Sequence, residues 1–309
     1  TRKYVWEICK KNYYDFGIDA FWLDNSEPDY GVYDFDHYRY IAGPALSCSN
    51  IYPQLYSRVF YDNMKDLGDG TVVNLLRCAW AGSQKYGNVV WSGDVPSTFE
   101  AFYDQLQAGL NMGLAGIPWW TADIGGFHGG DPKDPKFQEL LVRWFEYGTF
   151  CPVMRLHGYR WPLQPQYGTT GGATCVSGAP NEVWSYTDQV CEILSDYLRL
   201  RERMLPYITE LMEEAHEKGT PVMRPLFYDF PEDKESWNVE TEYMFGPKVL
   251  VKPITDADAR ETDVYLPGGA SWTNAWTGET FEGGQKVHVA APIEQIPLFT
   301  RDGYKLPMK

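Results

Sequence analysis

Short apolar runs, each closed by a charged residue, recur along the first half of the chain. Residues 18–23 are largely apolar and end at Asp24, and residues 89–91 lead through a Ser-Gly pair to Asp94. The other runs of this kind, with the charged residues that lie in or after them, are 72–79 with Arg77, 116–122 with Asp123, and 152–156 with Arg155 and His157. Such runs predict buried β-strands. A charge at the end of a buried strand is costly unless it is paired or used, so these positions are candidates for a site.

Segments of helical periodicity separate these runs. We expect helices over 4–16, 51–67, 97–111, 137–147 and 187–218, the last broken at Pro206. Ser97 is the expected N-cap of the third helix, with Glu100 completing a capping box. The alternation of strands and helices predicts a parallel sheet of about five strands. We therefore predict that residues 1–228 are the C-terminal part of a TIM (β/α)8 barrel, an α/β fold, with the other three strands upstream of Thr1.

The pattern changes after about Phe230. Short runs typical of β-strands cover 249–253, 262–266, 270–275, 286–290 and 296–300, separated by turns that contain glycine. Regular short strands with such turns predict a small antiparallel β-sandwich, to which we assign residues 229–309. Residues 30–50 and 164–180 lack periodicity and are expected to be loops.

Composition narrows the class of partner. The 309 residues carry a formal net charge of −15, with a pI of about 4.8, which argues against nucleic acid and anionic membranes as partners. No apolar run reaches the roughly 20 residues that span a bilayer. The 6 cysteines are scattered, without a CxxC or Cys/His cluster, so no metal or cofactor is expected. Aromatic residues make up 16% of the chain, and flat rings suit sugar binding as well as core packing.

Asp24 and Asp94 are the central pair of candidates. Glycoside hydrolysis needs two carboxyl groups that flank one bond, one of them ionised and the other protonated. Each aspartate alone could equally cap a helix, a common role for a loop aspartate. Together with Arg77, Asp123 and His157 at neighbouring strand ends, the pair favours a sugar-processing site.

Four motifs give the chain a resemblance to glycoside hydrolase family 31. Residues 22–28 (WLDNSEP) resemble the W-x-D-x-x-E-P nucleophile signature of this family. Residues 77–94 resemble its segment from an arginine to W-S/T-G-D, which ends in the acid/base. Residues 123–127 (DIGGF) resemble its D-x-x-G-F motif, and residues 143–157 resemble its R-W…R-x-H segment. Residues 220–309 also resemble the proximal C-terminal β-domain of the family.

The resemblance implies a retaining, exo-acting α-glycoside hydrolase that works through a covalent glycosyl-enzyme intermediate. It implies Asp24 as the nucleophile and Asp94 as the general acid/base. The residues that it places against the sugar are Trp22, Arg77, Trp91, Asp123, Phe127 and His157. Glu27 would orient the loop after the nucleophile. Arg155 would either hold the second oxygen of Asp24 or serve packing, and a structural ion pair suits Arg143 at least as well as a role in the site.

The resemblance leaves two sugars open. Asn25-Ser26 follow the nucleophile where common α-glucosidases read D-M-N-E, which favours an α-xylosidase over the alternative, an α-glucosidase. Exo action would also fit a pocket walled by large rings, and four tryptophans are expected to form it: Trp22, Trp91, Trp119 and Trp120.

Two further classes stay open as alternatives. One is a catalytically inactive carbohydrate-binding barrel, and the other is a metal-dependent barrel lyase or hydrolase with Asp and Glu at its strand ends. The expected partner is an oligosaccharide or a glycoside. The sequence does not decide the oligomeric state, nor whether the compartment is a bacterial periplasm or cytoplasm.

Overall fold

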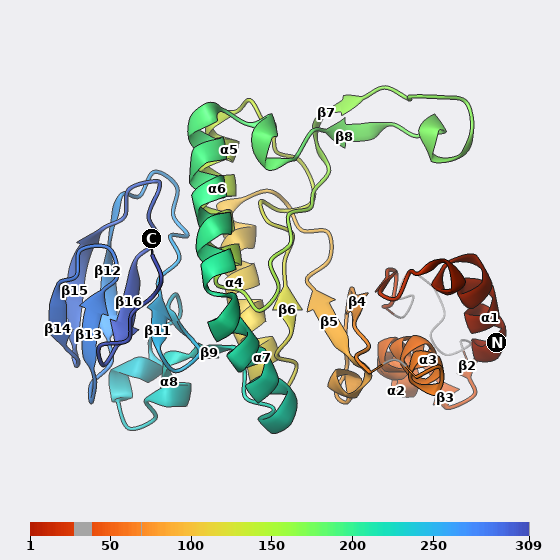
Figure 1. Ribbon diagram of the computed structural model, residues 1–309, viewed down its shortest axis with the longest axis horizontal. Helices are drawn as coiled ribbons and strands as arrows, with labels where there is room; N and C mark the ends of the chain where they lie inside the picture. Colours follow the sequence, from red (N-terminus) through yellow and green to blue (C-terminus); the bar gives the residue numbers. More distant parts are fainter. Residues whose placement is uncertain (28–38, 69, 309) are drawn as a thin grey trace.

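The computed structural model describes residues 1–27, 39–68 and 70–308. Figure 1 shows a parallel sheet with its helices in the first part of the chain and an antiparallel β-domain at the other end, with α4 to α7 between them. Residues 30–38 of the loop predicted over 30–50, and Pro28 of the first motif, lie outside the described residues. The described part of that loop forms β2 (Arg39–Tyr40), β3 (Gly43–Pro44) and the short helix α2 (Ala45–Cys48).

Four short strands form the parallel sheet among the described residues, in the order β1-β4-β5-β6. They are β1 (Phe21–Leu23), β4 (Asn74–Leu76), β5 (Asn88–Trp91) and β6 (Trp120–Thr121). The predicted fifth run, 152–157, is not a strand in the structure. Its backbone nevertheless follows β6, because the Val153 amide donates to Trp120 O at 3.2 Å and the Ile124 amide donates to Arg155 O at 3.3 Å. The parallel strands and their helices confirm the predicted partial barrel.

Amphipathic helices cover this sheet close to where the sequence predicts them. They are α1 (Arg2–Asn12), α3 (Tyr52–Asp66), α4 (Phe99–Leu114), α5 (Pro135–Thr149), α6 (Asp188–Arg203) and α7 (Leu205–Lys218). Helix α4 begins one residue later than expected, since its N-cap is Thr98, whose side chain accepts from the Ala101 amide. The prediction of Ser97 as the cap was therefore wrong. The break between α6 and α7 falls at Met204, where Pro206 enters the first turn of α7.

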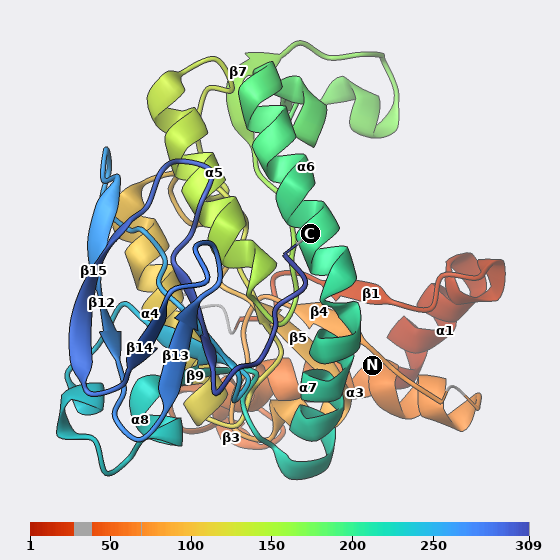
Figure 2. The same cartoon turned by 60° about the vertical axis from the view of Figure 1, so that its left-hand side comes forward.

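The segment predicted as a loop over 164–180 is mostly irregular, as expected, but two paired strands form its base. Strands β7 (Arg160–Gln164) and β8 (Ser177–Ala179) pair at its base. Figure 1 shows this segment projecting on the same side as the carboxyl ends of β4, β5 and β6, and Figure 2 shows it reaching away from α6. We call residues 160–180 the ribbon below.

The C-terminal part is antiparallel, as the sequence predicts. Six of its strands form one sheet in the order β14-β13-β16-β11-β10-β9, and β12 pairs with β15. In chain order the elements are β9 (Met223–Pro225), α8 (Leu226–Asp229), β10 (Tyr243–Phe245), β11 (Val249–Val251), β12 (Glu261–Leu266), β13 (Ser271–Asn274), β14 (Thr280–Glu282), β15 (Gln285–Ala290) and β16 (Leu298–Arg301). Strand β9 lies before residue 229 yet belongs to this sheet, and the division at 228/229 remains a prediction.

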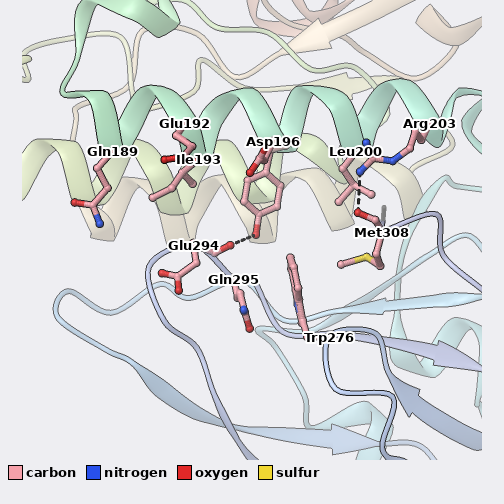
Figure 3. A pocket seen from close by; sticks show the side chains of 11 residues that line it. Gln189, Glu192, Ile193, Asp196, Leu200, Arg203, Trp276, Glu294, Gln295 and Met308 are labelled. Atoms are coloured by element: carbon pink, nitrogen blue, oxygen red, sulfur yellow. Dashed lines mark hydrogen bonds between the residues drawn. The ribbon is translucent and has the colours of Figure 1, made fainter.

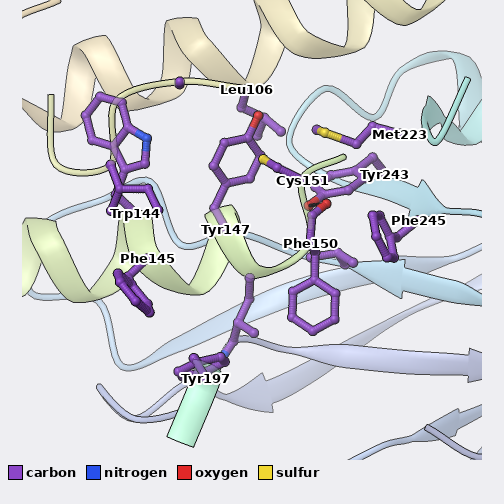
Figure 4. Packing of buried hydrophobic residues seen from close by; sticks show 14 of the residues in the cluster. Leu106, Trp144, Phe145, Tyr147, Phe150, Cys151, Tyr197, Met223, Tyr243 and Phe245 are labelled. Carbon is purple, nitrogen blue, oxygen red and sulfur yellow. Dashed lines mark hydrogen bonds between the residues drawn. The ribbon is translucent and has the colours of Figure 1, made fainter. Parts of the chain in front are cut away.

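A single aromatic core joins the two parts. Figure 4 shows Tyr147 of α5 and Phe150 of the turn after it packing toward Tyr243 and Phe245 of β10. Rings meet across the junction, with centroids 6.1 Å apart for Tyr147–Tyr243 and 5.9 Å apart for Phe150–Phe245. Aromatic contacts of this kind bury large areas of apolar surface, so the β-domain is packed firmly against the helical layer.

Candidate active site

The site lies at one edge of the parallel sheet. Parallel strands bring their carboxyl ends to the same edge, and the residue or loop after each strand carries a charged group there: Asp24 after β1, Arg77 after β4, Asp94 after β5 and Asp123 after β6. The alternation of strand and helix is therefore what brings groups from distant parts of the sequence together.

Arg77 is the hub of this edge. Its Nε lies 2.7 Å from Glu27 Oε1, and its Nη1 lies 3.5 Å from both Asp24 Oδ1 and Asp94 Oδ2. Because the two aspartate oxygens share one nitrogen, they cannot be more than twice that distance apart. That limit accommodates the separation of about 5–5.5 Å at which two carboxyl groups support a retaining mechanism.

Local backbone geometry holds both aspartates toward the hub. Asn25 adopts a left-handed conformation (φ 49°), which asparagine tolerates better than most residues, and its amide donates to Asp24 Oδ1 at 2.8 Å. Gly93 also has positive φ (81°), where glycine carries no steric penalty. A Cβ atom at Gly93 would lie 3.5 Å from Arg77 Nε. The turn before Asp94 therefore packs directly on the arginine.

A second ion pair lies beside the first. Arg155 pairs with Asp123, and its guanidinium lies over the rings of Trp22 and Trp91, 5.0 and 5.5 Å from their centroids. Asp123 is fully buried. Burial raises the pKa of Asp123 to about 7, against the opposing effect of Arg155. The Oδ2 atom of Asp123 has no hydrogen-bond partner among the described residues.

Aromatic rings form one wall of the site. Trp22 is 52% exposed and Trp91 is buried, and their ring centroids are 5.7 Å apart. His157 lies edge-on to Trp22 at 5.3 Å and stacks on Phe127 at 5.4 Å. Burial, helped by the positive charge of Arg155, lowers the pKa of His157 to about 4. The imidazole is therefore neutral near pH 7, able to donate one hydrogen bond and to accept another.

The structure brings together all ten predicted site residues, with three changes of detail. Arg155 pairs with Asp123 rather than with Asp24, so the first of its two expected roles was wrong. Glu27 holds Arg77. The expected ring of four tryptophans was wrong in half of its members, because Trp120 lies in the core and Trp119 stacks near His216 of α7.

Sequence reasoning missed Arg160, which is fully buried. Its guanidinium donates to the carbonyls of Ile124, Gly126 and Gly129 at 3.0, 2.9 and 3.2 Å. These carbonyls belong to the loop that carries Asp123 and Phe127. Arg160 therefore shapes that loop from behind. The only sequence signal was its position three residues after His157, because a buried arginine looks like any other arginine in a sequence.

A separate cavity of about 640 Å³ lies between α6 and the β-domain. Figure 3 shows Asp196 and Glu192 on α6 facing Glu294 and Trp276 across it. None of the strand-end residues lines it, so it is distinct from the candidate active site. In the described ranges no three His, Cys, Asp or Glu side chains are grouped so that they could hold a metal ion. No helix among the same residues is long and apolar enough to cross a membrane.

The chain matches two profiles of one family. Residues 1–211 match the one described as the glycosyl hydrolases family 31 TIM-barrel domain, and residues 219–306 match the one described as the glycosyl hydrolase family 31 C-terminal domain. An alpha-xylosidase of Saccharolobus solfataricus is 36% identical over 99% of this chain and 40% of its own length. Alpha-glucosidase 2 of Bacillus thermoamyloliquefaciens is 33% identical over 96% of this chain and 36% of its own length.

Solved structures agree with this match. A GH31 alpha-xylosidase from a soil metagenome, complexed with xylose, superimposes with a TM-score of 0.94 at 54% identity, over 99% of this chain and 45% of that one. A xylosidase from Aspergillus niger superimposes with a TM-score of 0.84 at 34% identity, over 98% of this chain and 47% of that one. The chain thus spans less than half the length of these relatives.

Proposed function

The chain belongs to glycosyl hydrolase family 31, and we propose that it carries the catalytic residues of a retaining, exo-acting α-glycoside hydrolase whose preferred substrate is an α-xyloside. The observation that carries the proposal is the position of Arg77 between Asp24 and Asp94. Two carboxyl groups from separate strands meet at one cation at the carboxyl edge of the sheet. A retaining hydrolase needs this kind of arrangement.

We assign Asp24 as the nucleophile and Asp94 as the general acid/base. The nucleophile attacks the anomeric carbon as a carboxylate, and Arg77 Nη1 lies 3.5 Å from Oδ1 of Asp24, where it helps to hold the side chain in place. Asp94 donates a proton to the departing oxygen and then takes one from the water that hydrolyses the glycosyl-enzyme. Glu27 acts through Arg77, whose position it fixes.

The charge balance of the site suits the reaction. Four carboxyl groups, those of Asp24, Glu27, Asp94 and Asp123, surround two guanidinium groups. The transition state of glycoside hydrolysis resembles an oxocarbenium ion and is positively charged. The carboxylate of Asp24, aimed at such a centre, stabilises it more than the neutral substrate, which is the requirement for catalysis.

The remaining site residues bind the terminal sugar. The buried Oδ2 of Asp123 has no partner among the described residues, and buried polar atoms are normally hydrogen-bonded, so a sugar hydroxyl is a fitting donor. His157 and Arg77 supply further polar contacts. Trp22, Trp91 and Phe127 form the apolar wall, and a pocket with this wall favours release of one sugar from the end of a chain.

The choice of α-xyloside rests on two supports. Asn25 and Ser26 follow the nucleophile, and Ser26 is fully buried and lies 3.8 Å from the sulfur of Cys78, which leaves a small residue beside the site. Similar proteins bear the name alpha-xylosidase. The name alpha-glucosidase also occurs among them, and this activity is the second candidate.

One experiment tests both parts of the proposal. The complete protein is assayed on p-nitrophenyl α-xyloside and α-glucoside, and the first-formed anomer of the product is read by NMR. We expect an α-anomer first and a kcat/KM that is roughly 10–200-fold higher for the xyloside, the usual effect of one added group in a fitted pocket. A first-formed β-anomer would refute the retaining mechanism. A tenfold preference for the glucoside would establish the second candidate.

A further inference from the structure

A groove of about 760 Å³ lies between the base of the ribbon and the loop at 171–176. Gly158 and Tyr159 form one wall, and Gly172, Ser177 and Asn181 are on the others. The groove begins one residue after His157, the last residue of the proposed sugar pocket. Since the ribbon projects on the side of the carboxyl ends of the strands (Figure 1), the groove opens at the same end of the molecule as the active site.

A continuous row of rings leads from the active site into this groove. His157 lies against Trp22, Phe127 stacks on His157, and Tyr159 stacks on Phe127 with centroids 6.3 Å apart and planes 18° from parallel. The Tyr159 backbone is fixed as well, since its amide donates to Phe127 O at 2.7 Å. The Tyr159 ring is therefore held where the sugar pocket ends and the groove starts.

Arg160 ties the groove to the same loop. While its Nη atoms hold the carbonyls behind Phe127, its Nε donates to Asn181 Oδ1 at 2.9 Å. Gly158 leaves room for this, because a Cβ atom there would come within 3.0 Å of the Arg160 guanidinium. The far wall of the groove is thus fixed relative to the sugar pocket by one buried side chain.

We propose that the groove is the subsite for the sugar on the leaving-group side of the scissile bond, with the Tyr159 ring as its stacking platform. This proposal rests on the proposed function, and it extends that site toward the aglycone. Sugar C–H faces pack on flat rings, and hydroxyls need polar partners at the edges. Asn181, which lines the groove, provides such a partner through its side-chain amide. The carboxylate of Glu182 is a second one at the same rim.

The test compares a substrate that fills the groove with one that does not. Kinetics of the complete protein are measured on an α-xylosyl-hexose disaccharide and on α-xylosyl fluoride, whose leaving group is a single atom. For Tyr159→Ala we expect kcat/KM for the disaccharide to fall about tenfold more than kcat/KM for the fluoride. Tyr159→Phe, which keeps the ring, should behave like the wild type on both substrates. Trp184→Ala, on the exposed turn nearby (77% exposed), is the matched control and should also leave both unchanged.

The outcomes separate this proposal from the one it rests on. If the wild type hydrolyses neither substrate, the proposed function fails. If both are hydrolysed and Tyr159→Ala lowers them equally or not at all, the groove is not an aglycone subsite. Gly172→Trp guards against a folding defect in the tyrosine variant. Its Cβ would meet nothing within 4 Å, so the substitution makes no clash at the backbone, and it should lower only the disaccharide rate.

Discussion

Two of the arginines that pair with carboxylates, Arg77 and Arg143, do so in opposite ways. Arg77, at the edge of the parallel sheet, is 26% exposed and contacts three carboxylates at 2.7 to 3.5 Å. Arg143, on α5, is completely buried with its single carboxylate partner, Glu146. Its Nη atoms also donate to the carbonyls of residues 259, 291, 292 and 295 in the β-domain.

The difference distinguishes an ion pair in a candidate active site, at Arg77, from one that holds two parts of the fold together, at Arg143. At Arg143 the protein itself surrounds the charge on every side, so a ligand has no access, and the pair fixes the β-domain to the helical layer. At Arg77 the carboxylates outnumber the cation and remain accessible, so their oxygens can act on a substrate. An ion pair is functional where it is incomplete and open. This view fits a structural role for Arg143.

Removing Asp24, the proposed nucleophile, should have the largest effect. For Asp24→Ala we expect kcat to fall by at least about 10⁴-fold, because every turnover passes through this carboxylate. The measurement is the steady-state hydrolysis of an aryl α-xyloside by the complete protein. Asp62→Ala, which breaks an exposed pair with Arg58 on α3, is the control and should retain activity. Substantial turnover by Asp24→Ala would contradict the assignment of a catalytic role to the carboxylates around Arg77.

The effect of removing Asp94, the proposed general acid, should depend on the leaving group. Asp94→Ala should lower kcat/KM by about 10²–10⁴-fold on a disaccharide, where the departing oxygen needs a proton. The loss should be much smaller on α-xylosyl fluoride, and added azide should restore turnover and yield a glycosyl azide. Equal losses on both substrates would contradict the division of roles between Asp24 and Asp94.

Breaking the buried pair of Arg143 and Glu146 should lower the stability of the protein rather than its catalytic rate. Arg143→Met leaves Glu146 buried without its cation, which typically costs about 3–5 kcal/mol. Urea unfolding measures this loss, and kcat per folded molecule should be unchanged. Arg199→Met, in an exposed pair with Asp196 on α6, is the matched control and should cost less than about 1 kcal/mol. If Arg143→Met lowered kcat without lowering stability, the contrast between the two arginines would collapse.

The smallest effect should come from His157. Its folded-state pKa of about 4 lies below the unfolded value of about 6.5. Between these two pH values the imidazole is protonated in the unfolded chain but not in the folded one. The free energy of unfolding therefore decreases as the pH falls from about 6.5 to 4. Asp123 acts in the opposite direction, since burial raises its pKa. The measurement that isolates the histidine is the difference in unfolding free energy between wild type and His157→Asn. We expect this difference to shift against the wild type at low pH, and a pH-independent difference would contradict the depressed pKa.

The sequence predicted much of this site because the ends of buried strands can be recognised from the residue pattern. Asp24, Arg77, Asp94 and Asp123 follow short apolar runs, and parallel strands must bring such positions together. The pairing of Arg155 with Asp123 could not be read in the same way, because it depends on side-chain reach across the edge. The role of Arg160 could not be predicted for a related reason. Most of its partners are backbone carbonyls, which every residue type has.

The fold was predictable to a similar depth. Periodicity located the long helices and the antiparallel nature of the C-terminal part. It did not reveal β7 and β8, because the ribbon has little apolar surface to bury and no alternation results. Nor did it choose between Ser97 and Thr98 as the N-cap of α4, since either hydroxyl can accept the hydrogen bond. That choice is made by packing, because the Ser97 hydroxyl instead accepts from Arg160 at 3.1 Å.

The ribbon leaves and re-enters the molecule at nearly the same point, since Arg160 pairs with Ala179 at its base. A segment whose two ends lie side by side can be lengthened, shortened or exchanged at small entropic cost to the rest of the fold. Arg160 fixes the base of the ribbon through its hydrogen bonds to Asn181 and to the Gly126 carbonyl. The tip of the ribbon can therefore be exchanged with little effect on the rest of the fold, while the strand ends keep their arrangement.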